Sequence, residues 1–211
     1  MKQELGEILP KLEEIIRFSL LNNPDLHTSF GGKYGELWVA TKLWRHDPKL
    51  ARERYTVKGL DRQGSCDIIL AGSKKKLEVK WAMYHHRNDD PFMKRVEGIP
   101  FWGWGFSSGK QFVERKFDYC ILLAADKDKA IPQHVFVIRI DEMTESSMGR
   151  LRKSGVSSKG SFYIEFSNNK EYYHRRRWHP HGPSPLEESL FKQRSMHEER
   201  WKELKKNGIL C

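Results

Sequence analysis

Two neighbouring segments decide the fold: Cys66-Asp67-Ile68-Ile69-Leu70 and Lys76-Leu77-Glu78-Val79-Lys80-Trp81. Each segment is short, rich in apolar residues and bounded by turn-forming residues, which favours a pair of adjacent β-strands. Residues 71–75, with the sequence Ala-Gly-Ser-Lys-Lys, are small or polar and suit a turn between the two strands. The sequence therefore predicts a β-hairpin around which the rest of the chain is organised.

Three charged side chains of this hairpin are expected to converge. Glu78 and Lys80 are two residues apart, so they project from the same face of the second strand. Asp67 begins the first strand, and antiparallel pairing brings its carboxylate to that face too. Two carboxylates suit a hard octahedral cation such as Mg²⁺, and the backbone carbonyl of Val79 is a further candidate ligand. Such a site suits phosphodiester hydrolysis, in which the metal activates water and a lysine stabilises negative charge.

The spacing of these residues resembles a known signature. Asp67, ten intervening residues and then Glu78-Val79-Lys80 look like the PD-(D/E)XK motif of restriction-endonuclease-like nucleases. In that family the Asp and the Glu bind a divalent metal and the Lys assists the attacking water. The resemblance therefore implies Mg²⁺, with Mn²⁺ able to substitute. Cys66 stands where the motif has proline, a residue that takes no part in the chemistry. The alternative is a surface hairpin with alternating charges.

A helix predicted over residues 31–43 precedes the hairpin. It opens after glycines and carries Leu37, Ala40 and Leu43 on one apolar face. Glu36 is placed in the first turn of this helix, close to the apolar face. The family often has an acidic residue on the helix before the sheet, aimed at the metal, and Glu36 is similar to it. The alternative is a glutamate favoured at the start of a helix by the helix dipole.

The charge of the chain points to a polyanionic partner. Its 211 residues include 38 Lys and Arg against 28 Asp and Glu, a formal net charge of +10. Nucleic acid is the commonest polyanion for such a protein, and an anionic lipid surface is the competing interpretation. No apolar run approaches the roughly 18 residues of a membrane span, and the acidic, amphipathic N-terminus does not resemble a signal peptide.

The cysteines indicate a reducing compartment. There are three of them, they are scattered along the sequence, and no Cys-x-x-Cys pair occurs. This pattern predicts a cytoplasmic protein without a thiolate metal site.

Candidate DNA contacts lie in polar and basic segments outside the motif. Some fall in a long irregular stretch predicted after Lys80, where polar side chains would read base edges or phosphates. Others lie in a basic segment with interleaved aromatic residues, which suits a nucleic-acid backbone but is also typical of a solvated face. The candidates are Arg87 and Asn88 in the irregular stretch, Lys110 and Gln111 on a short helix predicted over residues 109–116, and Arg175, Arg176 and Arg177 in the basic segment. The aromatic run over residues 101–106 either stacks on bases or caps the core.

The remaining elements follow from hydrophobic periodicity. The segment over residues 117–124 is almost wholly apolar, which is typical of a central strand covered on both faces. The two terminal helices, over residues 2–22 and 186–206, are expected to pack on the core or on a partner subunit. The full set of additional predicted elements comprises helices over 2–22, 109–116, 141–151 and 186–206 and strands over 54–57, 117–124, 135–140 and 162–166.

These elements predict an α/β fold with a restriction-endonuclease-like core. The expected sheet is mixed, with about five strands flanked by helices in the order α-β-β-β-α-β. We expect one domain over residues 1–211, with a catalytic core at about 30–125 and a basic, helical C-terminal extension over 170–211.

The resemblance implies a specific activity within this superfamily. A chain of this length looks like a Type II restriction endonuclease that cuts double-stranded DNA, and such enzymes are usually homodimers because a palindromic site suits two-fold symmetry. The alternatives are a structure-specific repair or recombination nuclease and a non-catalytic nucleic-acid-binding module.

Overall fold

The computed structural model describes residues 2–22, 27–46, 66–70, 73–83, 98–106, 117–126, 128–148, 162–176 and 182–207. Within these ranges the protein is α/β, with six α-helices, a four-strand mixed sheet and a two-strand sheet. None of the helices in these ranges is both long and apolar enough to cross a membrane. The elements are α1 (Lys2–Asn22), α2 (His27–His46), β1 (Ile68–Ile69), β2 (Lys76–Met83), β3 (Trp102–Phe106), β4 (Tyr119–Ala125), β5 (Pro132–Arg139), the 3₁₀ helix η3 (Ile140–Glu142), α5 (Glu145–Met148), β6 (Phe162–Phe166), α6 (Lys170–Arg176), α7 (Pro185–Lys192) and α8 (Arg194–Asn207).

The main sheet has the strand order β1-β2-β4-β5. β1 and β2 are antiparallel, β2 and β4 are parallel, and β4 and β5 are antiparallel. Every residue of β4 is buried, which confirms the central strand predicted from its apolar run. The parallel pair needs a crossover connection, and β3 lies within that connection. The predicted strand over 54–57 and the predicted helix over 109–116 lie outside the described residues.

The second sheet pairs β3 with β6 in antiparallel register, Trp102 opposite Phe166 and Trp104 opposite Ile164. We predicted a long irregular stretch after Lys80. This prediction is wrong at the two ends that the structure describes, because β2 continues to Met83 and residues 102–106 form a strand. The glycines of the Trp-Gly-Trp-Gly-Phe run hid this strand, since glycine is uncommon in strands. The strand nevertheless has a two-residue alternation, with bulky residues facing the core.

The aromatic side chains of β3 cap the core rather than face solvent. Trp102, Trp104 and Phe106 are each 1% exposed. The indole N–H of Trp102 donates to the carbonyl of Ala125 at 2.8 Å, and that of Trp104 donates to the carbonyl of Leu123 at 3.3 Å. These bonds tie the small sheet to β4, and they exclude base stacking by these aromatic rings in this conformation.

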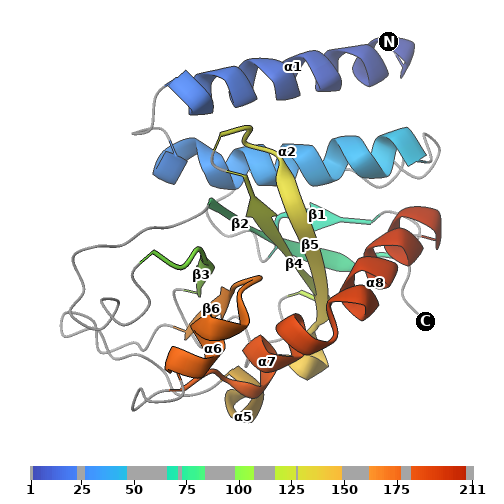
Figure 1. Ribbon diagram of the computed structural model, residues 1–211. Coiled ribbons are helices and arrows are strands. Elements are labelled where there is room, and N and C mark those ends of the chain that lie inside the picture. The colour runs from blue at the N-terminus through green and yellow to red at the C-terminus, as the bar shows by residue number, and fades with distance from the viewer. Residues whose placement is uncertain are drawn as a thin grey trace.

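The two faces of the main sheet carry separate cores, because successive strand residues point to opposite faces. One face, which includes Val79, Ile121 and Val137, packs against α2 and α8. The other face, which includes Cys120 and Phe136, packs against β3, β6 and α7. Figure 1 shows this layering, with α1 and α2 above the sheet in the view and β3, β6, α6 and α7 below it.

The C-terminal helical segment contributes to both cores. The single helix predicted over 186–206 is two helices, α7 and α8, which meet at Gln193. Ser184 caps α7, with Pro185 in the first turn. The segment packs on the core of its own chain, through Leu190 on one face of the sheet and Trp201 on the other.

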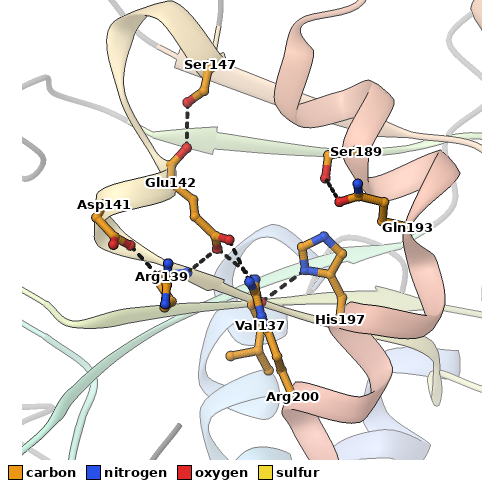
Figure 2. Close-up of polar contacts among 9 residues, drawn as sticks. All are labelled: Val137, Arg139, Asp141, Glu142, Ser147, Ser189, Gln193, His197 and Arg200. Carbon is orange, nitrogen blue, oxygen red and sulfur yellow. Dashed lines mark hydrogen bonds and ion pairs between the residues drawn. The ribbon is translucent and has the colours of Figure 1, made fainter. Parts of the chain in front are cut away.

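Polar contacts fix α8 along β5, as Figure 2 shows. The guanidinium of Arg200 donates to both carboxylate oxygens of Glu142, at 2.6 and 2.7 Å. The ring Nδ1 of His197 lies 3.0 Å from the carbonyl oxygen of Val137. Glu142 belongs to η3, so the start of the helix predicted over 141–151 is a 3₁₀ turn followed by the short α5.

Candidate active site

The predicted hairpin is present, and it brings the two acids close together. β1 pairs with β2 in antiparallel fashion, with Ile68 opposite Leu77. The backbone N–H of Asp67 donates to the carbonyl of Leu77 at 3.0 Å, which holds Asp67 against β2 just beyond the paired residues. The carboxylate of Asp67 is near enough to Glu78 for its negative charge to raise the pKa of that carboxyl. In the turn Lys74 takes a φ of 56°, the left-handed conformation that tight turns require.

Asp67 is anchored across the hairpin by its side chain. Its Oδ2 accepts a hydrogen bond of 2.7 Å from the backbone N–H of Val79. The carboxylate therefore lies against the backbone of β2 at Val79, the residue after Glu78. A charge-assisted bond to a backbone N–H is strong, so the position of this carboxylate is well defined.

Glu78 and Lys80 form a close ion pair in a mostly buried setting. The Nζ of Lys80 lies 2.6 Å from Oε1 of Glu78, and the two side chains are 27% and 6% exposed. Burial raises the pKa of Glu78, the negative charges of Asp67 and Glu36 raise it further, and Lys80 opposes this shift. Burial alone would lower the pKa of Lys80, but Glu78 raises it above its usual value. Lys80 is therefore a protonated hydrogen-bond donor at neutral pH.

Two further side chains surround Lys80 on this face of the sheet. The Nζ of Lys80 lies 5.5 Å from the ring centroid of Phe106, a cation–π contact supplied by the second sheet. Cys120 is opposite Glu78 in the β2–β4 register and is fully buried. Burial, reinforced by the charge of Glu78, raises the pKa of the Cys120 thiol well above its usual value. A neutral thiol and an aromatic ring thus limit solvent around the lysine.

Glu36 lies on α2, but not in its first turn. The helix begins at His27, so the predicted start at residue 31 is wrong and the dipole explanation for Glu36 does not hold. The glycines that suggested a helix start serve a close helix–strand approach. A Cβ at Gly31 would lie 2.8 Å from Cδ1 of Trp81, and one at Gly35 would lie 3.2 Å from Cβ of the same residue.

The carboxylate of Glu36 belongs to the same charged cluster as the hairpin acids. Its side chain is 10% exposed, and Lys33, three residues before it, donates to Oε1 at 2.7 Å and to Oε2 at 2.8 Å. Burial raises the pKa of Glu36, and the negative charge of Asp67 adds to this effect, while Lys33 and Lys80 oppose it. The charges of Asp67 and Lys80 therefore act on Glu36 even though it comes from a helix.

The donor set fits a magnesium ion held by few protein ligands. Among the described residues no group of three or more His, Cys, Asp or Glu side chains is arranged to hold a metal ion. Mg²⁺ is commonly bound by one or two carboxylates, with water and substrate phosphate completing its coordination. Asp67 and Glu78 provide two such carboxylates. Because the carboxylates of the cluster raise the pKa of Glu78, added positive charge there is favourable.

The proposed DNA-contacting residues have different outcomes. Arg176 is 9% exposed, and its Nη1 lies 2.8 Å from Oε2 of Glu165 and 3.2 Å from Oε2 of Glu187. This guanidinium is committed to two buried carboxylates, so we correct its predicted role as a phosphate contact. Arg175 is exposed and pairs with Glu171 at 2.9 Å, which leaves it at the surface. The other candidates lie outside the described residues: Arg87, Asn88, Lys110, Gln111 and Arg177.

Three residues near the candidate site were not predicted from the sequence: Lys33, Phe106 and Cys120. The Lys33–Glu36 pair has a helical i, i+3 spacing, a signal that was readable once both residues were placed on one helix. Phe106 and Cys120 have no such signal, because they reach the site through sheet pairing between distant segments.

Comparison with known proteins adds no further constraint on this site. No protein-family model matches the chain, and no curated protein matches it either.

Proposed function

We propose that the chain is a Mg²⁺-dependent endonuclease that hydrolyses phosphodiester bonds of double-stranded DNA. The observation that carries this proposal is the closeness of Asp67, Glu78 and Lys80 at the hairpin: Asp67 is bonded to the N–H of Val79, Glu78 is paired with Lys80, and the charge of Asp67 acts on Glu78. Two adjacent carboxylates and a protonated lysine match the needs of this chemistry in number and charge. The combination is also the one that the PD-(D/E)XK resemblance predicts.

In this proposal each residue has a distinct task. Asp67 and Glu78 would hold the metal, together with the backbone carbonyl of Val79. A bound Mg²⁺ lowers the pKa of its water and offsets negative charge on the phosphate. Lys80 is kept protonated by Glu78, so it donates a hydrogen bond to the attacking water or to developing negative charge. Glu36 would act through a water molecule or a second metal.

The wider proposal concerns substrate and assembly. A net charge of +10 favours binding to DNA phosphates, with an affinity that falls steeply as salt concentration rises. We propose a homodimer of the Type II restriction class, in which Mn²⁺ substitutes for Mg²⁺. Within the described part of the chain, Cys66 and Cys120 are not joined in a disulfide, which is compatible with the cytoplasmic location that we propose.

One incubation series tests the proposal. Supercoiled plasmid, a mixed-sequence duplex, single-stranded DNA and branched DNA are each incubated with the protein in Mg²⁺, in Mn²⁺ or in chelator. Discrete plasmid fragments that require metal and disappear in Asp67→Asn support a restriction endonuclease. Cutting confined to branched substrates favours a repair or recombination nuclease. Binding that is indifferent to metal, with every substrate intact, contradicts the catalytic proposal and favours a binding module.

A further inference from the structure

The two lysines of the candidate site are held in different ways. Lys80 projects from a central strand and is 27% exposed, with Phe106 against it. Lys33 projects from α2 and is 55% exposed, although the carboxylate that it holds is only 10% exposed. Lys80 is therefore confined to the site, whereas Lys33 has an ammonium group in contact with solvent and a long flexible stem.

Lys33 also holds both oxygens of its partner. Its Nζ lies 2.7 and 2.8 Å from the two carboxylate oxygens of Glu36, so it occupies the side of that carboxylate where another cation would bind. A cation approaching Glu36 must displace Lys33 or share the carboxylate with it. Two cations beside one carboxylate repel each other, which makes displacement the favourable course.

We propose that Lys33 is an exchangeable counter-ion that couples DNA binding to metal binding. Without DNA, Lys33 neutralises Glu36. When DNA binds, the ammonium group of Lys33 transfers to a backbone phosphate, and the carboxylate of Glu36 becomes available to a divalent cation directly or through water. This inference rests on the proposed nuclease function, and it makes Lys33 a positioning residue that also contacts substrate.

Coupling of this kind must be reciprocal. If DNA raises the affinity for the metal by some factor, the metal raises the affinity for DNA by the same factor. Between two sites such factors are typically about 5- to 150-fold. Loss of Lys33 is expected to separate the two binding events, since Glu36 is then free for the cation whether or not DNA is present.

The test measures binding, not cleavage. Free Mn²⁺ is followed by electron paramagnetic resonance during titration of the full chain, with and without a short mixed-sequence duplex, whose integrity is checked on a gel. The variant is Lys33→Gln, and the matched control is Lys42→Gln. Lys42 is on the same helix, and its Nζ lies 5.2 Å from the ring centroid of Trp38 rather than beside a carboxylate of the cluster.

We expect Lys33→Gln to bind Mn²⁺ about fivefold more tightly than the wild type without DNA, and to gain less affinity when the duplex is added. Lys42→Gln should match the wild type in both measurements. Lys33→Arg, which keeps a cation that can pair with both oxygens, should restore the wild-type coupling. In a Glu36→Gln background, the change at Lys33 should have no further effect on Mn²⁺ affinity.

The outcomes separate the two proposals. If the wild type binds Mn²⁺ in a manner abolished by Asp67→Asn, but Lys33→Gln and Lys42→Gln behave alike, the role of Lys33 is refuted and the metal site stands. If the wild type has no Mn²⁺ site that depends on Asp67, the proposed function fails first and the inference fails with it. Circular dichroism of each variant checks that it remains folded.

Discussion

The candidate active site and the cluster around Arg176 both hold two glutamates against cationic side chains, yet the bonding differs. In the Arg176 cluster, Tyr172 donates to Oε2 of Glu165 at 2.7 Å. The backbone N–H groups of Glu165 and Ser184 donate to the two oxygens of Glu187, at 2.8 and 2.7 Å. The carboxylates of this cluster are therefore bound by several donors, and the cation is an arginine.

In the candidate site each glutamate faces a lysine. Glu78 pairs with Lys80 and Glu36 with Lys33, and neither pair includes a guanidinium. An ammonium is a compact charge on a flexible stem, whereas a guanidinium holds a fixed planar fork. The carboxylates around Arg176 are thus fixed by several donors, whereas Glu78 and Glu36 each depend mainly on one lysine, which under the proposed function leaves them open to a metal ion. Substitutions in each cluster test this difference.

The largest effect is expected at the acids of the hairpin. Asp67→Asn or Glu78→Gln should abolish metal-dependent DNA cleavage, because one remaining carboxylate cannot hold the cation in place. DNA binding should persist or tighten, since repulsion between the acid and the phosphates falls. Plasmid cleavage and filter binding measure the two properties on the same samples.

The control for this prediction is Glu203→Gln, on the exposed surface of α8. It makes the same change of charge far from the hairpin strands in sequence and should leave cleavage at the wild-type rate. Normal cleavage by folded Glu78→Gln would mean that the site is elsewhere in the chain.

The second-largest effect is expected on stability, in the cluster around Arg176. Arg176→Met should lower the free energy of unfolding by about 3–5 kcal/mol, because it leaves two buried carboxylates without their cation. Arg175→Met, the exposed neighbour, should change it by less than about 0.5 kcal/mol. Urea unfolding followed by tryptophan fluorescence measures both. Equal stabilities of the two variants would contradict the structural role given to Arg176.

Lys80 provides the third test, because it separates metal binding from rate enhancement. Lys80→Met should slow cleavage about 10²- to 10³-fold, the usual cost of one lost stabilising donor. Mn²⁺ binding should remain, since both carboxylates are still present. Single-turnover cleavage measures the rate, and a loss of Mn²⁺ affinity as large as that of Asp67→Asn would instead make Lys80 structural.

The smallest effect is a pH-dependent change in stability at Glu36. Burial raises the pKa of this carboxyl above its ordinary value of 4.5. At pH values between 4.5 and the raised pKa, the folded state therefore binds more protons than the unfolded state. The contribution of Glu36 to wild-type stability therefore becomes more favourable as pH falls through that window.

Glu36→Gln removes the buried charge and should be more stable than the wild type at neutral pH, with an advantage that shrinks as pH falls through the same window. Each kcal/mol of relief raises Tm by about 2–4 °C in a chain of this size. Thermal unfolding of both proteins across the pH range checks the sign. A constant difference at every pH would show that titration of Glu36 is not its cause.

The sequence was informative where neighbours in the chain are also neighbours in space. The hairpin, the closeness of Asp67 and Glu78, and the buried strand β4 all follow from short-range patterns in the sequence. The start of α2 could not be predicted in this way. Gly31 and Gly35 resemble a helix boundary in the sequence, but in the structure they allow the helix to approach Trp81 closely.

Tertiary burial explains the other failures. The basic composition around Arg176 suggested a DNA-binding surface, and only the fold places Glu165 and Glu187 beside it. The strand β3 was missed because its glycines are uncommon in strands, which outweighed its two-residue alternation, and because its partner β6 lies far along the chain.

The pairing of β3 with β6 has a consequence for the order in which the protein assembles. The hairpin closes a short loop, with Ile68 opposite Leu77, whereas Phe106 pairs with Phe162 across a much longer one. Contacts between distant residues carry a larger loop-closure cost and tend to form late. We therefore expect the hairpin that carries Glu78 and Lys80 to form before Phe106 is fixed against Lys80. During synthesis on the ribosome, the site would acquire this aromatic cover only after β6 has been made.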